Sequence, residues 1–187
     1  MEMKTDIVIV GTGVGGLFSA LNLPRDKQIV MITKEDMQSS DSFLAQGGIC
    51  VLRGEEDYSS YFEDTMKAGH YENRKESVDI MIRSSREVID DLVDCGVEFE
   101  RQNGEFVYTR EGAHSKPRIL FHEDITGKEI TSKLLEQVKK LPNVAIYEYT
   151  AMTDILERAG RCHGIVAKTK AGEEMEIWAD YTILASG

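Results

Sequence analysis

The chain has 187 residues, of which 41% are hydrophobic and 29% charged, a composition that predicts a globular domain and excludes collagenous or disordered proteins. Its 22 Lys and Arg stand against 33 Asp and Glu, and the resulting net charge of −11 disfavours partners such as nucleic acid or anionic lipid. Three cysteines without CxxC spacing, and the lack of an apolar run long enough for a membrane span or a signal peptide, predict a cytoplasmic protein with neither a metal site nor a membrane anchor.

The first elements along the chain predict a βαβ unit. Asp6 to Val10 is a mostly β-branched run that ends in Gly11, as is typical of a strand buried on both faces in a parallel sheet. An apolar stripe between Gly13 and Pro24 predicts a helix, and residues 28–33 have the length and apolar content of a second strand. Residues 34–56 are rich in Ser, Asp and Gly, so we expect a long loop with at most one helical turn.

Two amphipathic helices and a hairpin are predicted next. Apolar stripes indicate one helix over residues 58–69 and another over 78–93. Asn73 and Glu76 have the spacing of a capping box for the second helix, and Gly96 suits its left-handed end. Alternating residues on both sides of Asn103-Gly104 predict a β-hairpin with a type I′ turn or a close relative of it.

The last third of the chain predicts one helix and several strands. Thr126-x-x-Glu129 opens a helix that Pro142 stops, and residues 144–149 then predict a third parallel strand. Three short alternating stretches over 153–157, 164–169 and 175–178 predict an antiparallel meander. We expect 181–187 to be one more buried strand, and because it stops where a turn should begin, we expect the chain to be truncated.

Gly11-x-Gly13-x-x-Gly16, between a predicted strand and a predicted helix, predicts dinucleotide binding. The first glycine permits a tight turn, the second lets the backbone approach a pyrophosphate, and the third lets the helix pack on the strand. The free N–H groups at the helix start attract the anion. A tight turn without a ligand is the alternative. The candidate cofactor-binding residues are Gly11, Thr12, Gly13, Val14, Gly15 and Gly16.

The segment after the second strand leaves the nucleotide class open. Glu35 or Asp36 can bond a ribose, whereas Lys34 can bond a ribose or neutralise a phosphate, and a solvated charge cluster is the other interpretation. The predicted meander favours FAD, since plain NAD domains have a helix there. We therefore expect an α/β fold, a Rossmann-type FAD-binding domain with a parallel sheet and an antiparallel β-meander. Its expected parts are 1–50 with the dinucleotide and flavin loop, 51–125 with a helical and hairpin insertion, and 126–187 with the helix, third strand, meander and closing strand.

Several motifs together resemble one family along nearly the whole chain. The segment Ser40-Asp41-Ser42-Phe43-Leu44-Ala45-Gln46-Gly47-Gly48 resembles the S-x-T-x-x-A-Q-G-G segment of the succinate dehydrogenase and fumarate reductase flavoprotein superfamily. The segments Arg110-Glu111-Gly112-Ala113-His114-Ser115, Arg118-Ile119-Leu120 and Asp124-x-Thr126-Gly127-x-Glu129-Ile130 resemble the L-aspartate oxidase family within it. Ala185-Ser186-Gly187 is similar to the closing A-T-G of the superfamily.

The resemblance implies a non-covalently bound FAD. Membrane-bound members attach the flavin through a histidine at the position of Asp41, and a carboxylate cannot form that imidazole linkage. Ser42 keeps a hydroxyl for a phosphate or the ring edge, and Gln46 to Gly48 would bring amide groups to the isoalloxazine. A loop without a ligand is the alternative, and we expect Cys50 to be a small core thiol. The further cofactor-binding candidates are Lys34, Asp41, Ser42, Ala45, Gln46, Gly47, Gly48, Met152 and Gly187.

The same resemblance implies substrate-binding residues. In these oxidases the glutamate that matches Glu111 orients the substrate near its amino group, and a carboxylate complements an ammonium. A basic cluster can face the substrate carboxylates. The candidates for substrate binding are His114, Arg118, His122 and Thr126. A surface pair with Arg110 is the alternative for Glu111, and ordinary loop polarity is the alternative for the cluster.

The activity implied by the resemblance is FAD-dependent oxidation of L-aspartate to iminoaspartate, for quinolinate and NAD biosynthesis. Oxygen or fumarate would reoxidise the flavin, and quinolinate synthase is a candidate partner. The catalytic arginine, the capping domain and the C-terminal helical domain of this family would lie beyond Gly187, so we expect this chain alone to be inactive. The alternatives are a soluble flavoprotein of the fumarate reductase or succinate dehydrogenase type and a non-catalytic nucleotide-binding module.

Overall fold

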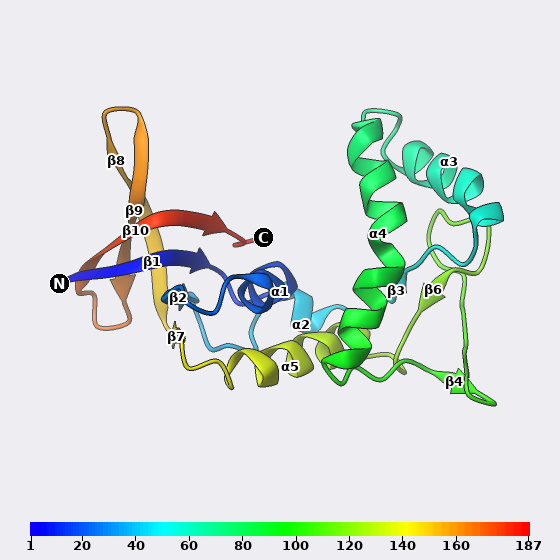
Figure 1. Ribbon diagram of the computed structural model, residues 1–187, viewed down its shortest axis with the longest axis horizontal. Helices are drawn as coiled ribbons and strands as arrows, with labels where there is room; N and C mark the ends of the chain where they lie inside the picture. Colours follow the sequence, from blue (N-terminus) through cyan, green and yellow to red (C-terminus); the bar gives the residue numbers. More distant parts are fainter. The chain divides into compact units, whose positions relative to one another are not determined.

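Two structural units make up the chain in the computed structural model, which describes all residues from 1 to 187. The first unit comprises Met1–Leu44 and Ile130–Gly187, and the second comprises Ala45–Glu129. Figure 1 shows the elements of each unit along the chain. No helix combines the length and the apolar character needed to cross a membrane.

A six-stranded sheet forms the first unit (Figure 1). In spatial order its strands are β7 (Val144–Tyr147), β2 (Ile29–Ile32), β1 (Glu2–Val10), β10 (Glu174–Leu184), β9 (Arg161–Thr169) and β8 (Thr150–Arg158). The first four are parallel, whereas β9 and β8 form an antiparallel extension. The α/β fold with a parallel sheet and an antiparallel meander is thus confirmed.

The centre of this sheet is apolar on both faces. All four residues of β2 and the last four of β1 are buried, which explains why these runs lack the alternation of a half-exposed strand. Helix α1 (Val14–Asn22) buries Leu17 and Ala20. Helix α5 (Thr126–Val138) buries Leu134 and Val138, and its residues from Ile130 onwards belong to the first unit.

One prediction about the end of the chain is wrong. The third meander strand and the closing strand are a single strand, because β10 runs without interruption from Glu174 to Leu184. Its first half pairs with β9 up to Trp178, while β1 pairs with it along almost its whole length. Because Ala179 and Asp180 are neither Gly nor Pro, no strand-breaking residue separates the two predicted strands. The closing part is also not fully buried, for Tyr181 is 68% exposed.

The second unit contains two helices and two short antiparallel pairs. A 3-10 turn η1 (Glu55–Asp57) leads into helix α3 (Tyr58–Ala68), and helix α4 (Lys75–Asp94) follows. Leu52, Tyr61, Met66, Val78 and Ile82 form the buried cluster between these helices. The short pairs are β3 (Ile49–Cys50) with β6 (Ile119–Leu120), and β4 (Arg101–Gln102) with β5 (Glu105–Phe106).

Local predictions in this unit are partly confirmed. Asn103 and Gly104 have φ angles of 54° and 88°, the positive values that a type I′ turn requires, so the predicted hairpin is present. Gly96, with φ 95°, ends α4 as expected. The predicted capping box is wrong, since α4 begins after Arg74 without a side-chain cap. The Asn73 amide instead faces backbone carbonyls at the end of α3.

Candidate functional site

A crevice of about 660 Å³ lies in the first unit where parallel strands end. In open α/β sheets, ligands bind at the carboxyl ends of the strands. Strand β1 leads into Gly11, β2 leads into Thr33, and β10 leads into Ala185. The crevice is lined by Val10–Gly13, Ile32–Glu35, Ser39–Ser42, Thr150–Thr153 and Leu184–Gly187.

Two glycines of the fingerprint are required by close backbone contacts. Gly11 has a φ of 110°, and a Cβ there would lie 2.2 Å from the Ala185 carbonyl oxygen. A Cβ on Gly16 would lie 2.1 Å from the carbonyl oxygen of Gly11. Both separations are far below van der Waals contact, so only glycine lets the chain turn beside β10 and lets α1 start directly over that turn.

The start of α1 has the properties of an anion site. Its first turn contains no acidic residue, and the Val14 N–H donates to Ser42 Oγ at 3.2 Å. Thr12 is 2% exposed, and its hydroxyl has no hydrogen-bond partner although it lines the crevice. An unpaired buried hydroxyl is costly, so this group favours a ligand that brings hydrogen-bonding oxygens. The residues present therefore fit the diphosphate of a dinucleotide.

Most sequence-predicted cofactor residues of the first unit line this crevice. They are Gly11, Thr12, Gly13, Lys34, Asp41, Ser42, Met152 and Gly187. Glu35 also lines it, so the choice between Lys34 and Glu35 for a ribose stays open. Sequence reasoning missed Thr150 and Thr153, which follow β7. Because β7 is parallel to β2, the segment after β7 arrives at the same edge of the sheet as the segment after β2. The predicted parallel order of these strands could therefore have identified Thr150 and Thr153.

In the second unit, Gly47 and Gly48 have different surroundings. A Cβ on Gly48 would lie 2.3 Å from the Leu120 carbonyl oxygen, so pairing between β3 and β6 requires glycine there whether or not a ligand binds. A Cβ on Gly47 would lie 3.5 Å from Glu111 Oε2, an ordinary contact distance. The Glu111 carboxylate is therefore beside the Gly47 backbone.

Glu111 is exposed on a loop whose two ends are held together. Thr109 and Ile119 exchange both backbone hydrogen bonds, at 3.0 and 3.1 Å, and this bridge closes the loop formed by residues 110–118. Gly112 has a φ of 57°, and the His114 N–H donates to the Glu111 carbonyl at 3.3 Å. The carboxylate is accessible, while its backbone is part of a turn.

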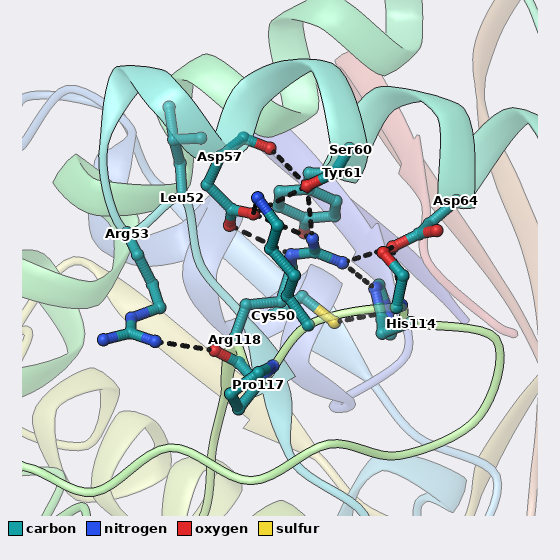
Figure 2. A network of polar contacts seen from close by, with 12 residues as sticks. Cys50, Leu52, Arg53, Asp57, Ser60, Tyr61, Asp64, His114, Pro117 and Arg118 are labelled. Atoms are coloured by element: carbon teal, nitrogen blue, oxygen red, sulfur yellow. Dashed lines mark hydrogen bonds and ion pairs between the residues drawn. The ribbon is translucent and has the colours of Figure 1, made fainter.

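Arg118 is fully buried at the end of this loop (Figure 2). Its Nε and Nη2 donate to the two carboxylate oxygens of Asp57 at 3.0 and 2.8 Å, and its Nη1 donates to Asp64 Oδ2 at 2.6 Å. Nη1 also lies 3.0 Å from His114 Nδ1. The guanidinium fork expected to face a substrate carboxylate is thus engaged by two carboxylates of the chain itself.

The other members of the predicted basic cluster are only partly together. His114 joins Arg118 in the buried network, whereas the backbone N–H of His122 donates to the hydroxyl of Thr126 at 3.0 Å. Thr126 is buried at the first turn of α5, so its hydroxyl ties the turn before that helix to the helix start. Asp57, Asp64 and Cys50 were not expected at this network, and no local pattern links them to Arg118.

Asp64 makes the unit sensitive to acid. Burial raises the pKa of this carboxyl, but hydrogen bonds from Ser115 and Arg118 outweigh it and lower the pKa to about 2. Because the folded pKa lies below the ordinary value of 3.8, the stabilisation is complete above pH 3.8 and is lost as the pH falls towards 2.

We expect urea unfolding, measured between pH 5 and pH 2, to show this loss of free energy. The Asp64→Asn variant should be less stable at pH 5 and should depend less on pH than the parent protein. Asp26→Asn serves as the control, because the Asp26 side chain is 75% exposed and its removal should change the stability at pH 5 by little. Identical profiles for the parent and Asp64→Asn proteins would contradict the assignment.

Comparisons with known proteins give consistent matches. The model of the family described as "FAD binding domain" matches residues 6–187. The L-aspartate oxidase of Clostridium perfringens is 44% identical over 187 residues, which is all of this chain and 42% of that protein. The L-aspartate oxidase of Clostridium acetobutylicum is 40% identical and is covered to 43% of its length. The chain thus spans less than half the length of these relatives.

Solved structures share the fold. A mutant of the E. coli quinol fumarate reductase FrdA superposes with a TM-score of 0.94 at 24% identity, over all of this chain and 33% of that one. The Mycobacterium smegmatis Sdh1 in complex with UQ1 gives a TM-score of 0.89 at 22% identity, over all of this chain and 34% of that one. At these identities the likeness shows a common fold and nothing finer.

Proposed function

Because the chain belongs to the FAD binding domain family, we propose that it binds FAD and forms part of a flavoenzyme that oxidises L-aspartate to iminoaspartate. The observation that carries the choice of substrate is the exposed Glu111 carboxylate beside Gly47, in two segments that both resemble L-aspartate oxidases. The 44% sequence identity to an L-aspartate oxidase supports the same choice.

The crevice residues would hold the FAD diphosphate. The backbone at Thr12 and Gly13, the unpaired Thr12 hydroxyl and the first turn of α1 would provide neutral donors for it. Lys34 or Glu35 would contact the ribose. Asp41 cannot form a histidyl linkage, so the cofactor would be bound non-covalently. When bound, FAD supplies the hydride acceptor for oxidation at the substrate α-carbon.

Glu111 would select the amino group. A carboxylate attracts the ammonium of L-aspartate and repels a dicarboxylate that lacks an amine. Gln46 and the Gly47 backbone, on the segment beside Glu111, would contact the substrate together with Glu111. The chain's part in the reaction is therefore to bind and orient, while its closed loop keeps the carboxylate in a defined position.

The surrounding chemistry follows from this proposal. Iminoaspartate is unstable in water, so an enzyme such as quinolinate synthase would consume it on the way to NAD. Oxygen or fumarate would reoxidise the flavin. We place the reaction in the cytoplasm. A fumarate reductase activity is the second candidate, because the segment from Ser40 to Gly48 resembles the flavoprotein superfamily that contains both kinds of enzyme.

The Glu111→Gln variant of the complete enzyme that contains this chain tests the proposal. We expect kcat/KM for L-aspartate to fall about 10- to 100-fold, because a hydrogen bond to a charged group is worth roughly 1.5–3 kcal/mol. Inhibition by succinate, which has no amine, should strengthen or stay unchanged. Steady-state kinetics with both compounds gives these values.

Glu105→Gln is the matched control, since Glu105 is an exposed glutamate in the hairpin of the same unit. It should leave the kinetics unchanged. Full aspartate turnover by Glu111→Gln would contradict the role of Glu111 in selecting the substrate. Fumarate reduction without aspartate oxidation by the parent enzyme would favour the fumarate reductase alternative, and a complete protein without flavin absorbance would overturn both candidates.

A further inference from the structure

The loop that carries Glu111 is held at its middle as well as at its ends. Ser115 donates twice to Asp64 Oδ2, from its backbone N–H at 2.8 Å and from its hydroxyl at 2.7 Å. The same oxygen accepts a hydrogen bond from Arg118. Through Ser115, four residues after Glu111, the loop is thereby fixed to helix α3. His114, three residues after Glu111, contacts Tyr61 of the same helix. Glu111 itself is left free to meet a ligand.

His114 lies between Arg118 and Cys50 (Figure 2), and these two neighbours determine its tautomer. Arg118 can only donate, so its Nη1, at 3.0 Å, requires a lone pair on His114 Nδ1. The proton of the neutral ring must then be on Nε2, which lies 3.0 Å from Cys50 Sγ and donates to it. The ring also packs edge-on against Tyr61. Both nitrogens are therefore engaged by the chain.

This hydrogen-bond chain connects the Glu111 loop with the glycine segment. Cys50 is the second residue of β3, the strand that begins directly after Gly48. Arg118 directly precedes β6, the partner strand of β3. His114 bridges the two from within the loop. Since Glu111 Oε2 lies 3.5 Å from the Cβ position of Gly47, a shift between loop and β3 would move the carboxylate along that segment.

We infer that His114 is a positioning residue: through Arg118 and Cys50 it fixes the Glu111 carboxylate beside Gly47, and so determines how well the enzyme binds an amino dicarboxylate. His114 acts through Glu111 and does not itself touch the substrate. This inference rests on the proposed function, and it differs from the sequence prediction that His114 binds a substrate carboxylate directly.

Kinetics of the complete FAD-loaded enzyme separate these roles. In His114→Phe, which keeps a ring against Tyr61 but has no nitrogens, we expect KM for L-aspartate to rise about tenfold with little change in kcat. In the Glu111→Gln background the same change should have no further effect, because a residue that acts through Glu111 has nothing left to position. Fully additive losses would show direct substrate contact and overturn the inference, as would an unchanged KM in the single variant.

A pair of Cys50 variants checks the same chain without altering the histidine. Cys50→Ser keeps a hydrogen-bond acceptor and should retain the parent KM, whereas Cys50→Ala removes it and should raise KM. Flavin absorbance and the thermal unfolding midpoint are recorded for every variant. A rise in KM that accompanies lost flavin or a lower midpoint would indicate a structural role only, and equal KM values for the two variants would contradict the inference.

Two measurements do not need aspartate turnover. ¹⁵N-histidine NMR of the enzyme reports the tautomer directly. This chain contributes only four histidines to the spectrum. We expect protonated Nε2 and unprotonated Nδ1 at His114, and the opposite tautomer overturns the inference even if the proposed function holds. If instead the tautomer is as expected and Glu111→Gln has no kinetic effect, the proposed function is wrong, whereas the hydrogen bonds that link Arg118, His114 and Cys50 are confirmed.

Acid pH should disrupt the same contact. Burial lowers the pKa of His114, and the nearby Arg118 lowers it further, although Asp57 and Asp64 oppose the shift. Cys50, Tyr61 and Arg118 are the other titratable groups around the ring. His114 is therefore neutral above its ordinary pKa of 6.5, and KM should rise only below that pH. His114→Phe should lack this rise, and the same rise in that variant contradicts the assignment.

Discussion

Replacing Arg118 with methionine is expected to lower the free energy of unfolding by about 3–5 kcal/mol, the usual loss when one partner of a buried ion pair is removed. The side chains of Asp57 and Asp64 are only 4% and 13% exposed, and both carboxylates accept hydrogen bonds from the guanidinium that this variant lacks. Arg118 therefore matters through the carboxylates that its removal would leave buried. Urea unfolding followed by circular dichroism measures the effect.

Arg83→Met is the matched control. Arg83 forms an equally short ion pair with Asp79, at 2.8 Å, but the two side chains are 54% and 40% exposed. Such surface pairs contribute about 0–1 kcal/mol, so this variant should be nearly as stable as the parent protein. Adding Asp57→Asn to Arg118→Met should restore part of the stability by removing one unpaired charge. A loss below about 1 kcal/mol in Arg118→Met would contradict the role of the network.

The Gly16→Ala variant is expected to weaken FAD binding by about 100-fold or more, which corresponds to roughly 2.7 kcal/mol. The added Cβ would lie 2.1 Å from the Gly11 carbonyl oxygen, so α1 must move away from the turn that precedes it. That movement displaces the N–H groups that would face the diphosphate. Titration of the apoprotein with FAD, followed by flavin fluorescence, gives the dissociation constant.

Gly15→Ala provides the control from the same helix turn. Its Cβ would meet only the Ala185 Cβ, at an ordinary 3.8 Å. Because alanine favours a helix over glycine by about 0.5–1 kcal/mol, this variant should bind FAD normally and be slightly more stable. Similar affinities for the two alanine variants would show that the fingerprint turn is not the FAD site.

Local features of this protein were predictable because local geometry causes them. The hairpin at Asn103-Gly104 depends on two residues that tolerate positive φ, and it is present. The strand before Gly11 and the helix after it follow from apolar periodicity. Errors occurred where another segment competed, as when Asn73 bonds the end of α3 instead of capping α4.

In the candidate site, too, local contacts were predictable from the sequence and long-range contacts were not. Gly11 and Gly16 were identified with their correct structural reasons, since a glycine pattern states where backbones approach closely. Gly48 was identified with a different reason, because its contact is with β6, about 70 residues further along the chain. His114 and Arg118 were singled out together, but as groups open to substrate, whereas they bond each other inside the second unit.

The amino-acid order alone determined the strand–glycine–helix start, the α/β class and the family to which the chain belongs, because these depend on neighbouring residues. The tertiary structure alone decided what Arg118 does. Its partners Asp57 and Asp64 lie 61 and 54 positions away, on η1 and α3, and no sequence period connects such residues. Whether a charged side chain faces solvent, substrate or another charge depends on which elements pack against it, and that is settled only when the chain has folded.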